Sequence, residues 1–335
     1  MIRVFESLRL KKWHNLSSGQ GIGEHEMSSR ELIALGTSSQ VPTRERSHNA
    51  YLLRWDGGEG FLFDPGEGAQ RQFTLAGVSV NSIYHICITH FHGDHCLGLA
   101  GIVQRLSLDC CQHPVHVYYP ESGQVYVDRL CSAAIYQPQV ELILHPIGPS
   151  GDMIQLGRAE TYTLMCQALD HAVPTIGFRV EEPPGIRFVQ EKLDQAGVRG
   201  PLVGELERNG SICIDGRVLY LEEVTVPRKG SAFAFIMDTR PCPGAVTLAR
   251  DADLLVMEAT YTSEHRDLAG SYYHSTAADA AKIASRAGVQ RLALAHFSQR
   301  YPDAGQHLMD ALEFFPDVVA LNDLDRIDIP RRAQK

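Results

Sequence analysis

The sequence predicts an α/β fold, because strand-like and helical segments alternate along most of the chain. Short apolar runs recur between segments whose apolar residues follow the helical period. The second half of the chain repeats this rhythm loosely, so two αβ halves around a shared core are expected. Apolar residues make up 44% and charged residues 21% of the chain, a composition typical of a globular protein.

The individual elements follow from these runs. In the first half, strands are expected over 31–35, 49–55, 60–66, 84–90 and 114–119, and helices over 95–108 and 121–135. In the second half, strands are expected over 232–239, 253–260 and 291–297. A helix between the last two strands is opened by Ser275 or Thr276 and closed by Gly288.

Two segments do not follow the rhythm. Residues 1–28 show no clear period and are expected to form a loosely ordered extension, followed by a single domain over 29–335. Residues 181–210 lie between the two halves and are rich in Pro, Gly and charged residues. We therefore expect this second segment to be an insertion into the domain.

Charge and cysteine content restrict the classes of function. A net charge of −9 disfavours binding of nucleic acid by the whole surface, because phosphate recognition draws on Lys and Arg, although a local patch would suffice. The cysteines form no CxxC pair, which argues against a disulfide scaffold or zinc ribbon. No run approaches the roughly 20 apolar residues of a membrane helix, and no secretory signal is recognisable. A cytoplasmic protein is expected.

The stretch THFHGDHCLGL (89–99) contains four metal-capable side chains. His90 and His92 follow a predicted strand two positions apart, so both can turn toward one ion. Asp94 and His95 begin a predicted helix and can face a second ion. Three imidazoles and a carboxylate suit zinc, and manganese or iron fit the same ligand types. This density between a strand and a helix predicts a metal site rather than a chance cluster.

Three later residues stand at or just after the ends of apolar strands: His171, Asp238 and His296. Together with the histidine-rich stretch, this order resembles the metallo-β-lactamase superfamily, which implies a four-layer αβ/βα sandwich holding two ions. The resemblance implies that one ion is held by His90, His92 and His171. It implies that the other is held by Asp94, His95 and His296, with Asp238 bridging. An aspartate rather than a cysteine after the third motif favours phosphodiester hydrolysis over β-lactam opening.

A narrower resemblance covers about residues 31–330. The motifs LGTSSQVPTRERS, FDPGEGAQRQF, DTR, EATY, YYHST and HFSQRY are similar to those of the ribonuclease Z (tRNase Z) family. The resemblance implies a zinc-dependent endoribonuclease with two Zn²⁺ per subunit, which removes 3′ trailers from precursor tRNA. It also implies a homodimer, in which the arm of one subunit presents tRNA to the active site of the other.

The additional motifs suggest catalytic roles. His274 can protonate the leaving 3′ oxygen of the RNA, a step that needs a donor beside the metals. Glu258 can orient that imidazole, and Asp94 can serve as general base as well as ligand. Ser275 and Thr276 are expected either to cap the following helix or to contact phosphate at its N-terminus.

The insertion, taken as about 181–215, falls where the family carries its flexible arm. Gly200 and Pro201 match the Gly-Pro motif of that arm, which implies contact with tRNA. Between residues 179 and 217, however, the chain contains six basic and seven acidic side chains. Because phosphate binding favours a basic surface, an alternative stays open: a binuclear phosphodiesterase for small or cyclic diesters. A non-catalytic RNA-binding protein is disfavoured, since every expected ligand is present.

Overall fold

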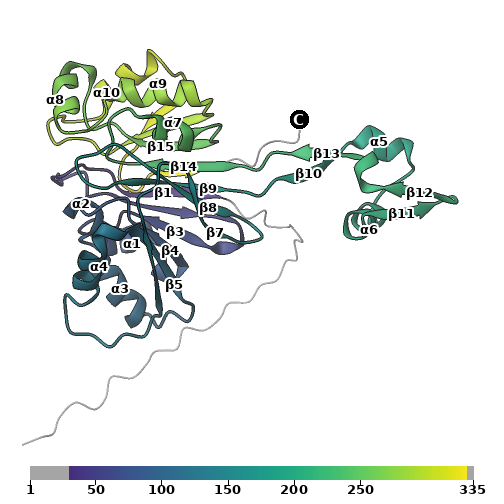
Figure 1. Ribbon diagram of the computed structural model, residues 1–335, viewed down its shortest axis with the longest axis horizontal. Coiled ribbons are helices and arrows are strands. Elements are labelled where there is room, and N and C mark those ends of the chain that lie inside the picture. Colours follow the sequence, from purple (N-terminus) through teal and green to yellow (C-terminus); the bar gives the residue numbers. More distant parts are fainter. Residues whose placement is uncertain (1–29, 330–335) are drawn as a thin grey trace, which may run out of the picture.

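The computed structural model describes residues 30–329, so the extension predicted over 1–28 lies outside the described residues. Two seven-stranded sheets pack face to face, and an arm projects from one side (Figure 1). Between residues 30 and 329 no helix is long and apolar enough to cross a membrane.

The first sheet is built almost entirely from the N-terminal half. Its strand order is β18 (Arg326–Asp328), β1 (Glu31–Gly36), β2 (Ala50–Arg54), β3 (Gly60–Phe63), β4 (Ile83–Cys87), β5 (Val115–Pro120) and β6 (Leu142–Ile147). The strands from β3 to β6 run parallel. Helices α1 (Ala69–Ala76), α3 (Leu99–Leu108) and α4 (Gln124–Cys131) cover the outer face, as parallel connections require.

The second sheet contains the C-terminal half. Its strand order is β17 (Val318–Ala320), β16 (Arg291–Ala295), β15 (Leu254–Glu258), β14 (Ala232–Ile236), β9 (Ile176–Glu181), β8 (Thr163–Ala168) and β7 (Ile154–Arg158). Strands β14 to β17 are parallel. Its outer face carries α7 (Pro243–Ala249), α9 (Ala277–Ala287) and α10 (Gly305–Leu312), with α8 (Arg266–Ser271) nearby.

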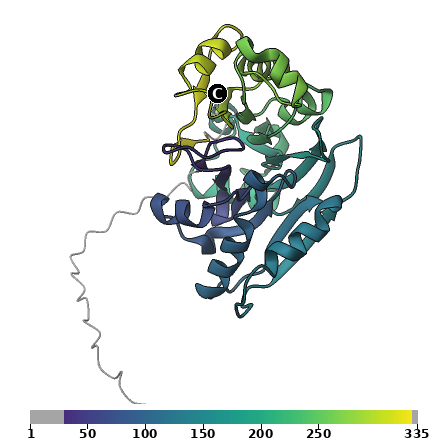
Figure 2. The ribbon, with the colours of Figure 1, turned by 90° about the vertical axis from the view of Figure 1, so that its left-hand side faces the viewer.

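Three buried layers hold these elements together. Large aromatic side chains, including Tyr51, Phe63, Phe178 and Phe235, fill the space between the sheets. Two further apolar layers lie beneath the helices on the two outer faces. Figure 2 shows the two sets of helices on opposite sides of the sheets. The predicted four-layer αβ/βα sandwich is confirmed.

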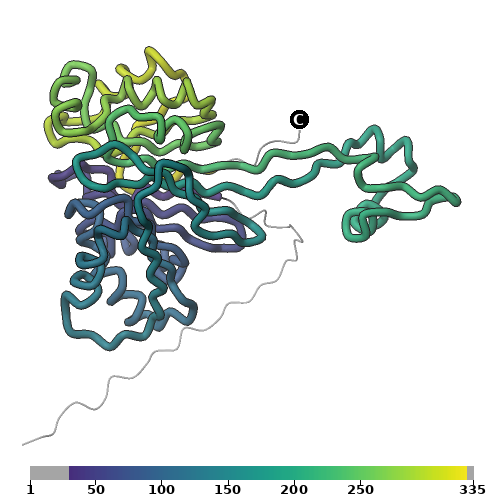
Figure 3. Tube along the Cα trace, in the orientation of Figure 1, coloured from purple at the N-terminus to yellow at the C-terminus, as the bar shows by residue number. Residues whose placement is uncertain are grey.

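The arm leaves the body between β9 and β14. Its stalk is an antiparallel pair, β10 (Gly185–Phe188) and β13 (Thr225–Arg228). Its far end contains α5 (Gln190–Gln195), α6 (Pro201–Asn209), β11 (Ser211–Ile214) and β12 (Arg217–Tyr220), as Figures 1 and 3 show. A separate apolar core fills this end, consisting of Leu193, Val198, Leu206, Ile212, Leu219 and Val224. The projecting segment therefore continues past residue 215, because β13 is needed to pair with β10.

One predicted helix is divided in two, one is shorter than expected, and one has the predicted ends. The helix predicted over 95–108 is divided into α2 (Gly93–Cys96) and α3, because the Gly98 N–H donates to the Pro65 carbonyl over 2.9 Å and so leaves the helical hydrogen-bond series. Only glycine fits at position 98, where a Cβ would lie 1.9 Å from the Gly66 carbonyl oxygen. The helix predicted over 121–135 is helical as α4 only to Cys131. In α9, Thr276 is the N-cap and Gly288 the C-cap, as predicted.

Candidate metal centre and active site

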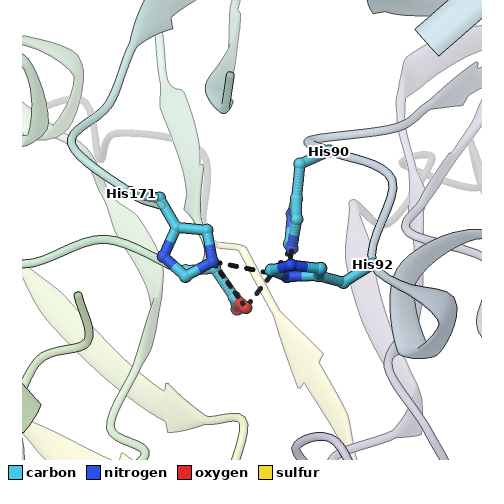
Figure 4. A group of neighbouring side chains, drawn as sticks. His90, His92 and His171 are labelled. Atoms are coloured by element: carbon cyan, nitrogen blue, oxygen red, sulfur yellow. Dashed lines mark hydrogen bonds and ion pairs between the residues drawn. The ribbon is translucent and has the colours of Figure 1, made fainter. Parts of the chain in front are cut away.

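The first ligand group forms where β4 and β8 end. His90 and His92 follow β4, and His171 follows β8, so the three rings converge from two sheets (Figure 4). His92 Nδ1 lies 2.9 Å from His90 Nε2 and 3.4 Å from His171 Nε2. Asp238 Oδ2 approaches the same place, 3.4 Å from His90 Nε2 and 3.8 Å from His171 Nε2.

The second ligand group lies beside the first. Asp94 and His95 belong to α2, and His296 follows β16. His95 Nε2 is 3.3 Å from both Asp94 Oδ2 and His296 Nε2. His296 Nε2 is 3.4 Å from Asp94 Oδ2. The structure thus brings the seven predicted ligand residues into two adjoining groups.

Asp238 connects the groups by presenting one oxygen to each. Oδ2 faces the first group, whereas Oδ1 lies 3.3 Å from His95 Nε2 and 3.0 Å from His296 Nε2 in the second. Its side chain is buried at the end of β14, and Oδ1 has no hydrogen-bond partner. A buried carboxylate oxygen without a hydrogen bond is costly unless a cation faces it.

The donor spacing and chemistry fit divalent ions. Zinc ligands at about 2.0–2.1 Å in a tetrahedron lie about 3.3–3.4 Å from one another, and the separations given above run from 2.9 to 3.8 Å. Burial lowers the pKa of His90, His92 and His171, which favours the neutral imidazole that binds metal. Burial opposes ionisation of Asp238, but the surrounding histidines hold its pKa well below its ordinary value.

Four of the ligand imidazoles are anchored through their second ring nitrogen. The Nδ1 atom of His90 lies 3.0 Å from Thr89 Oγ1, and that of His95 lies 2.8 Å from Asp64 Oδ2. The Nδ1 atom of His171 lies 3.0 Å from the Tyr273 carbonyl oxygen, and that of His296 lies 2.7 Å from Thr260 Oγ1. Such partners fix the tautomer and direct Nε2 toward the ion. Sequence reasoning did not assign these anchors, although all four lie in stretches that it singled out.

The backbone at the site is left-handed at several residues. Asp64, Asp238 and His296 follow the ends of β3, β14 and β16 with φ of 44°, 46° and 60°, and Tyr273 has φ of 60°. Positive φ is uncommon outside glycine. At Tyr273 this conformation accompanies a carbonyl that faces His171.

The partly buried His274 and the buried Glu258 form a pair beside the second ligand group. His274 Nδ1 donates to Glu258 Oε1 over 3.0 Å, and Glu258 is fully buried. Glu258 also accepts bonds from the backbone N–H groups of Thr239 and Ser275. Burial alone would lower the pKa of His274, but the carboxylates of Glu258 and Asp238 outweigh it and raise the pKa to about 9. The pair therefore favours the protonated form of His274.

Ser275 and Thr276 do not reach the cavity, which corrects the expectation that they contact phosphate. Both are fully buried. Ser275 Oγ donates to the Thr239 carbonyl, and its N–H is taken by Glu258. Thr276 caps α9 by accepting from the N–H of Asp279, while its own N–H donates to the Asp279 carboxylate. Their hydrogen-bonding groups are occupied within the protein.

The remaining predicted site residues, Gly200 and Pro201, lie on the arm. Gly200 precedes α6 with a φ of 57°, a conformation that favours glycine, and Pro201 is the first residue of that helix. Both are exposed at the far end of the arm, away from the ligand groups (Figure 1). They therefore belong to a second surface, separate from the metal centre.

The ligand groups open into a cavity of about 820 Å³. Its walls include the candidate ligands and proton donor His92, Asp94, His171 and His274, together with Tyr272, Tyr273, Gln299 and Arg300. A cavity of this size admits a nucleotide-sized group to the place where the two ligand groups meet.

The fold and the paired ligand groups define a metal-dependent hydrolase of the metallo-β-lactamase fold, a class that binds divalent metal. A family model described as the metallo-β-lactamase superfamily matches residues 43–159. The chain is similar to a protein named ribonuclease Z from Nocardia farcinica, with 51% identity over 91% of this chain and all of that protein. A ribonuclease Z from Salinispora arenicola is 47% identical over 91% of this chain and 98% of its own length.

Among solved structures, human tRNase Z, short form, is similar with a TM-score of 0.66 and 26% identity, covering 90% of this chain and 99% of the human chain. The chain belongs to the ribonuclease Z family. The predicted family and the predicted class of enzyme, a metal-dependent endoribonuclease, are confirmed.

Proposed function

We propose that this protein removes 3′ trailers from precursor tRNA by hydrolysing one phosphodiester bond, which leaves a 3′ hydroxyl on the tRNA. The observation that carries the proposal is the placement of His274, bonded to Glu258, beside two ligand groups that share Asp238. The names of the relatives, ribonuclease Z and tRNase Z, support the same activity and substrate.

We infer that the two ligand groups hold two Zn²⁺, as their imidazole-rich donor sets favour, with Mn²⁺ or Fe compatible with the same ligands. One group is His90, His92 and His171, the other is Asp94, His95 and His296, and Asp238 contributes to both. When bound, such a pair of ions activates a water at neutral pH and stabilises negative charge on phosphoryl oxygens.

The protein's own residues then handle the protons. Asp94 is 6% exposed at the cavity wall, and we propose that its carboxylate orients the attacking water and accepts its proton. When the bond between phosphorus and the leaving 3′ oxygen breaks, the electron pair stays on that oxygen. His274 donates the proton that neutralises it, while Glu258 holds the imidazole and its positive charge in place.

The arm supplies the surface for the body of the tRNA in this proposal, with Gly200 and Pro201 at the contact. We further propose a homodimer in which the arm of one subunit serves the other's site. The whole projecting segment from 182 to 230 carries seven basic and eight acidic side chains. Docking would therefore depend on local geometry and backbone donors more than on net charge.

The eight cysteines are free thiols, which supports a reducing cytoplasmic location.

The decisive experiment incubates zinc-loaded protein with a 3′-extended precursor tRNA and with bis(p-nitrophenyl) phosphate. We expect a single cut at the 3′ end of the tRNA body by the wild type, and no cut by Asp94→Ala at equal fold content. Cleavage of the small diester alone would instead favour the alternative, a binuclear phosphodiesterase for small or cyclic diesters. Absence of both activities in protein with two zinc ions bound would contradict the proposal.

A further inference from the structure

Thr260 occupies the junction between the second ligand group and the Glu258–His274 pair. Its side chain is 2% exposed. Its Oγ1 lies 2.7 Å from His296 Nδ1, 2.6 Å from Glu258 Oε2 and 3.3 Å from His274 Nδ1. One hydroxyl therefore contacts a ligand residue, a buried carboxylate and the proposed proton donor.

The backbone fixes this position. Strands β15 and β16 run parallel with Glu258 opposite Ala295, so the residues that follow the two strands, Thr260 and His296, come to lie side by side. On the other side, Tyr261 forms a bridge with Thr276, which holds the segment carrying His274 against the end of β15. Thr260 is thus held between two segments that each carry a functional histidine.

The direction of each hydrogen bond can be assigned. A carboxylate only accepts, so the single proton of the Thr260 hydroxyl points to Glu258. The oxygen of Thr260 must then accept the Nδ1–H of His296, which leaves the Nε2 lone pair directed at Asp94 and Asp238. This is the tautomer that a metal ligand needs.

The other anchoring groups have different further hydrogen-bond partners. Thr89 donates its hydroxyl proton to Asp64, and Asp64 anchors His95, so these two belong to a network on the first sheet. The Tyr273 carbonyl only accepts. Among the anchors identified in residues 30–329, Thr260 is the one whose side chain bonds to Glu258.

We propose that Thr260 is a positioning residue that couples the His296 ligand to the Glu258–His274 pair, so that one hydroxyl sets both the ligand tautomer and the place of the proton donor. The inference rests on the proposed role of His274 as donor to the leaving oxygen. It predicts two separable defects when the hydroxyl is lost, one in metal binding and one in proton donation.

The test compares Thr260→Val, which removes the hydroxyl at similar volume, with Thr260→Ser, which keeps it. Thr262→Val is the matched control, because Thr262 is also buried, lies two residues further on and contacts only Tyr301 through its hydroxyl. Zinc affinity is measured by competition with a chromogenic chelator. We expect Thr260→Val to weaken one of two zinc sites by about 10- to 100-fold, and Thr260→Ser and Thr262→Val to stay within about threefold of wild type.

Proton donation is measured at saturating zinc with two substrates that differ in their leaving group. A sugar 3′ oxygen needs a proton to leave, whereas p-nitrophenolate leaves without one. We expect Thr260→Val to lower kcat on precursor tRNA by about 100-fold, and on bis(p-nitrophenyl) phosphate by less than about threefold. Thr260→Ser should restore the tRNA rate.

Several outcomes would overturn the coupling. If Thr260→Val lowers kcat equally on both substrates at saturating zinc, Thr260 only anchors His296. If its zinc affinity is unchanged, Thr260 does not support the ligand. The same losses in Thr262→Val would point to packing alone. If the wild type cuts the small diester but not tRNA, the proposed function fails separately. A dinucleotide, which also has a sugar oxygen as leaving group, then replaces tRNA in the same comparison.

Discussion

The metal centre and the arm differ in how their functional residues are held. At the centre, ligands such as His90, His95 and His296 are almost fully buried and each has an anchoring partner. The anchors of His95 and His296 come from distant parts of the chain. On the arm, Gly200 and Pro201 are exposed, and the elements around them pack only on a core of six side chains. The centre is positioned by the whole sandwich, whereas the arm is positioned by itself and its two-stranded stalk.

This difference fits the two tasks proposed for the regions. Metal-assisted hydrolysis depends on donor atoms held to within about half an ångström, which requires a rigid and buried frame. Contact with a large RNA tolerates motion of the whole module. The two regions should therefore be separable by mutation.

The largest effect is expected from Asp238→Asn at the centre. The amide keeps the size of the side chain but offers one acceptor oxygen where the carboxylate presents one to each ligand group. We expect fewer than two zinc ions per chain and a fall in kcat of about three orders of magnitude or more. Elemental analysis and single-turnover kinetics measure both. Binding of precursor tRNA should persist, and its loss would mean that the regions are not separable.

The next effect is expected from removal of the arm. Glu182 and Ser231 are bonded across the base of the stalk, with the Glu182 N–H 2.8 Å from the Ser231 carbonyl. An Asn-Gly turn can therefore replace residues 183–230. We expect kcat/KM for precursor tRNA to fall by about 100-fold, and hydrolysis of bis(p-nitrophenyl) phosphate to change by less than about twofold, because only remote binding energy is lost. A comparable loss on both substrates would contradict this.

A smaller, local effect is expected from Leu206→Ala in the arm core. Leu206 is fully buried on α6. Truncation should destabilise the module by about 2–5 kcal/mol, because a core of this size has little surrounding structure to compensate. Hydrogen exchange is expected to speed up in 190–224 and to stay unchanged in the two sheets. Faster exchange throughout the sheets would show that the arm and body unfold together.

The smallest effect is expected at the base of the stalk, where Glu182 pairs with Arg30 and Arg228. Burial opposes ionisation, but the two guanidinium groups lower the pKa of Glu182 to about 2. A lowered carboxyl pKa stabilises the fold above the ordinary value of about 4.5, and this contribution disappears as the pH falls toward about 2. Glu182→Gln should cost about 1–2 kcal/mol at pH 7, and the cost should shrink in denaturant titrations at lower pH. An equal cost at all pH values would exclude the ion pairs as its source.

The sequence predicted the layers, and it identified candidate ligands that converge in the structure, because both depend on local signals. Four of the candidates lie within six consecutive positions, namely His90, His92, Asp94 and His95. The later candidates stand where apolar strands end. The anchors could not be predicted in the same way. Thr260 and Tyr273 contact ligand residues 36 and 102 positions away in the sequence, so only the packed sheets bring them together.

The remaining differences have similar causes. A helix N-terminus can be recognised from sequence, but whether it faces a cavity cannot, and Ser275 and Thr276 turned out to be buried. The break between α2 and α3 arises where the Gly98 N–H donates to the carbonyl of Pro65, which is distant in sequence. The stalk strand β13 lay beyond the predicted end of the insertion, because its four residues, Thr-Val-Pro-Arg, are too few to show a strand period.

The left-handed backbone at Asp64, Asp238 and His296 has a consequence for copies of this fold that no longer bind metal. Such a conformation costs roughly 1–2 kcal/mol at a residue such as His296 and less at an aspartate, which tolerates it. Bound ions offset that cost by stabilising the folded state alone. Without ions the same turns destabilise the fold, and substitution by Asn or Gly would lower this cost most. Replacements at these three strand ends should therefore mark inactive copies, even where the histidines that surround them are retained.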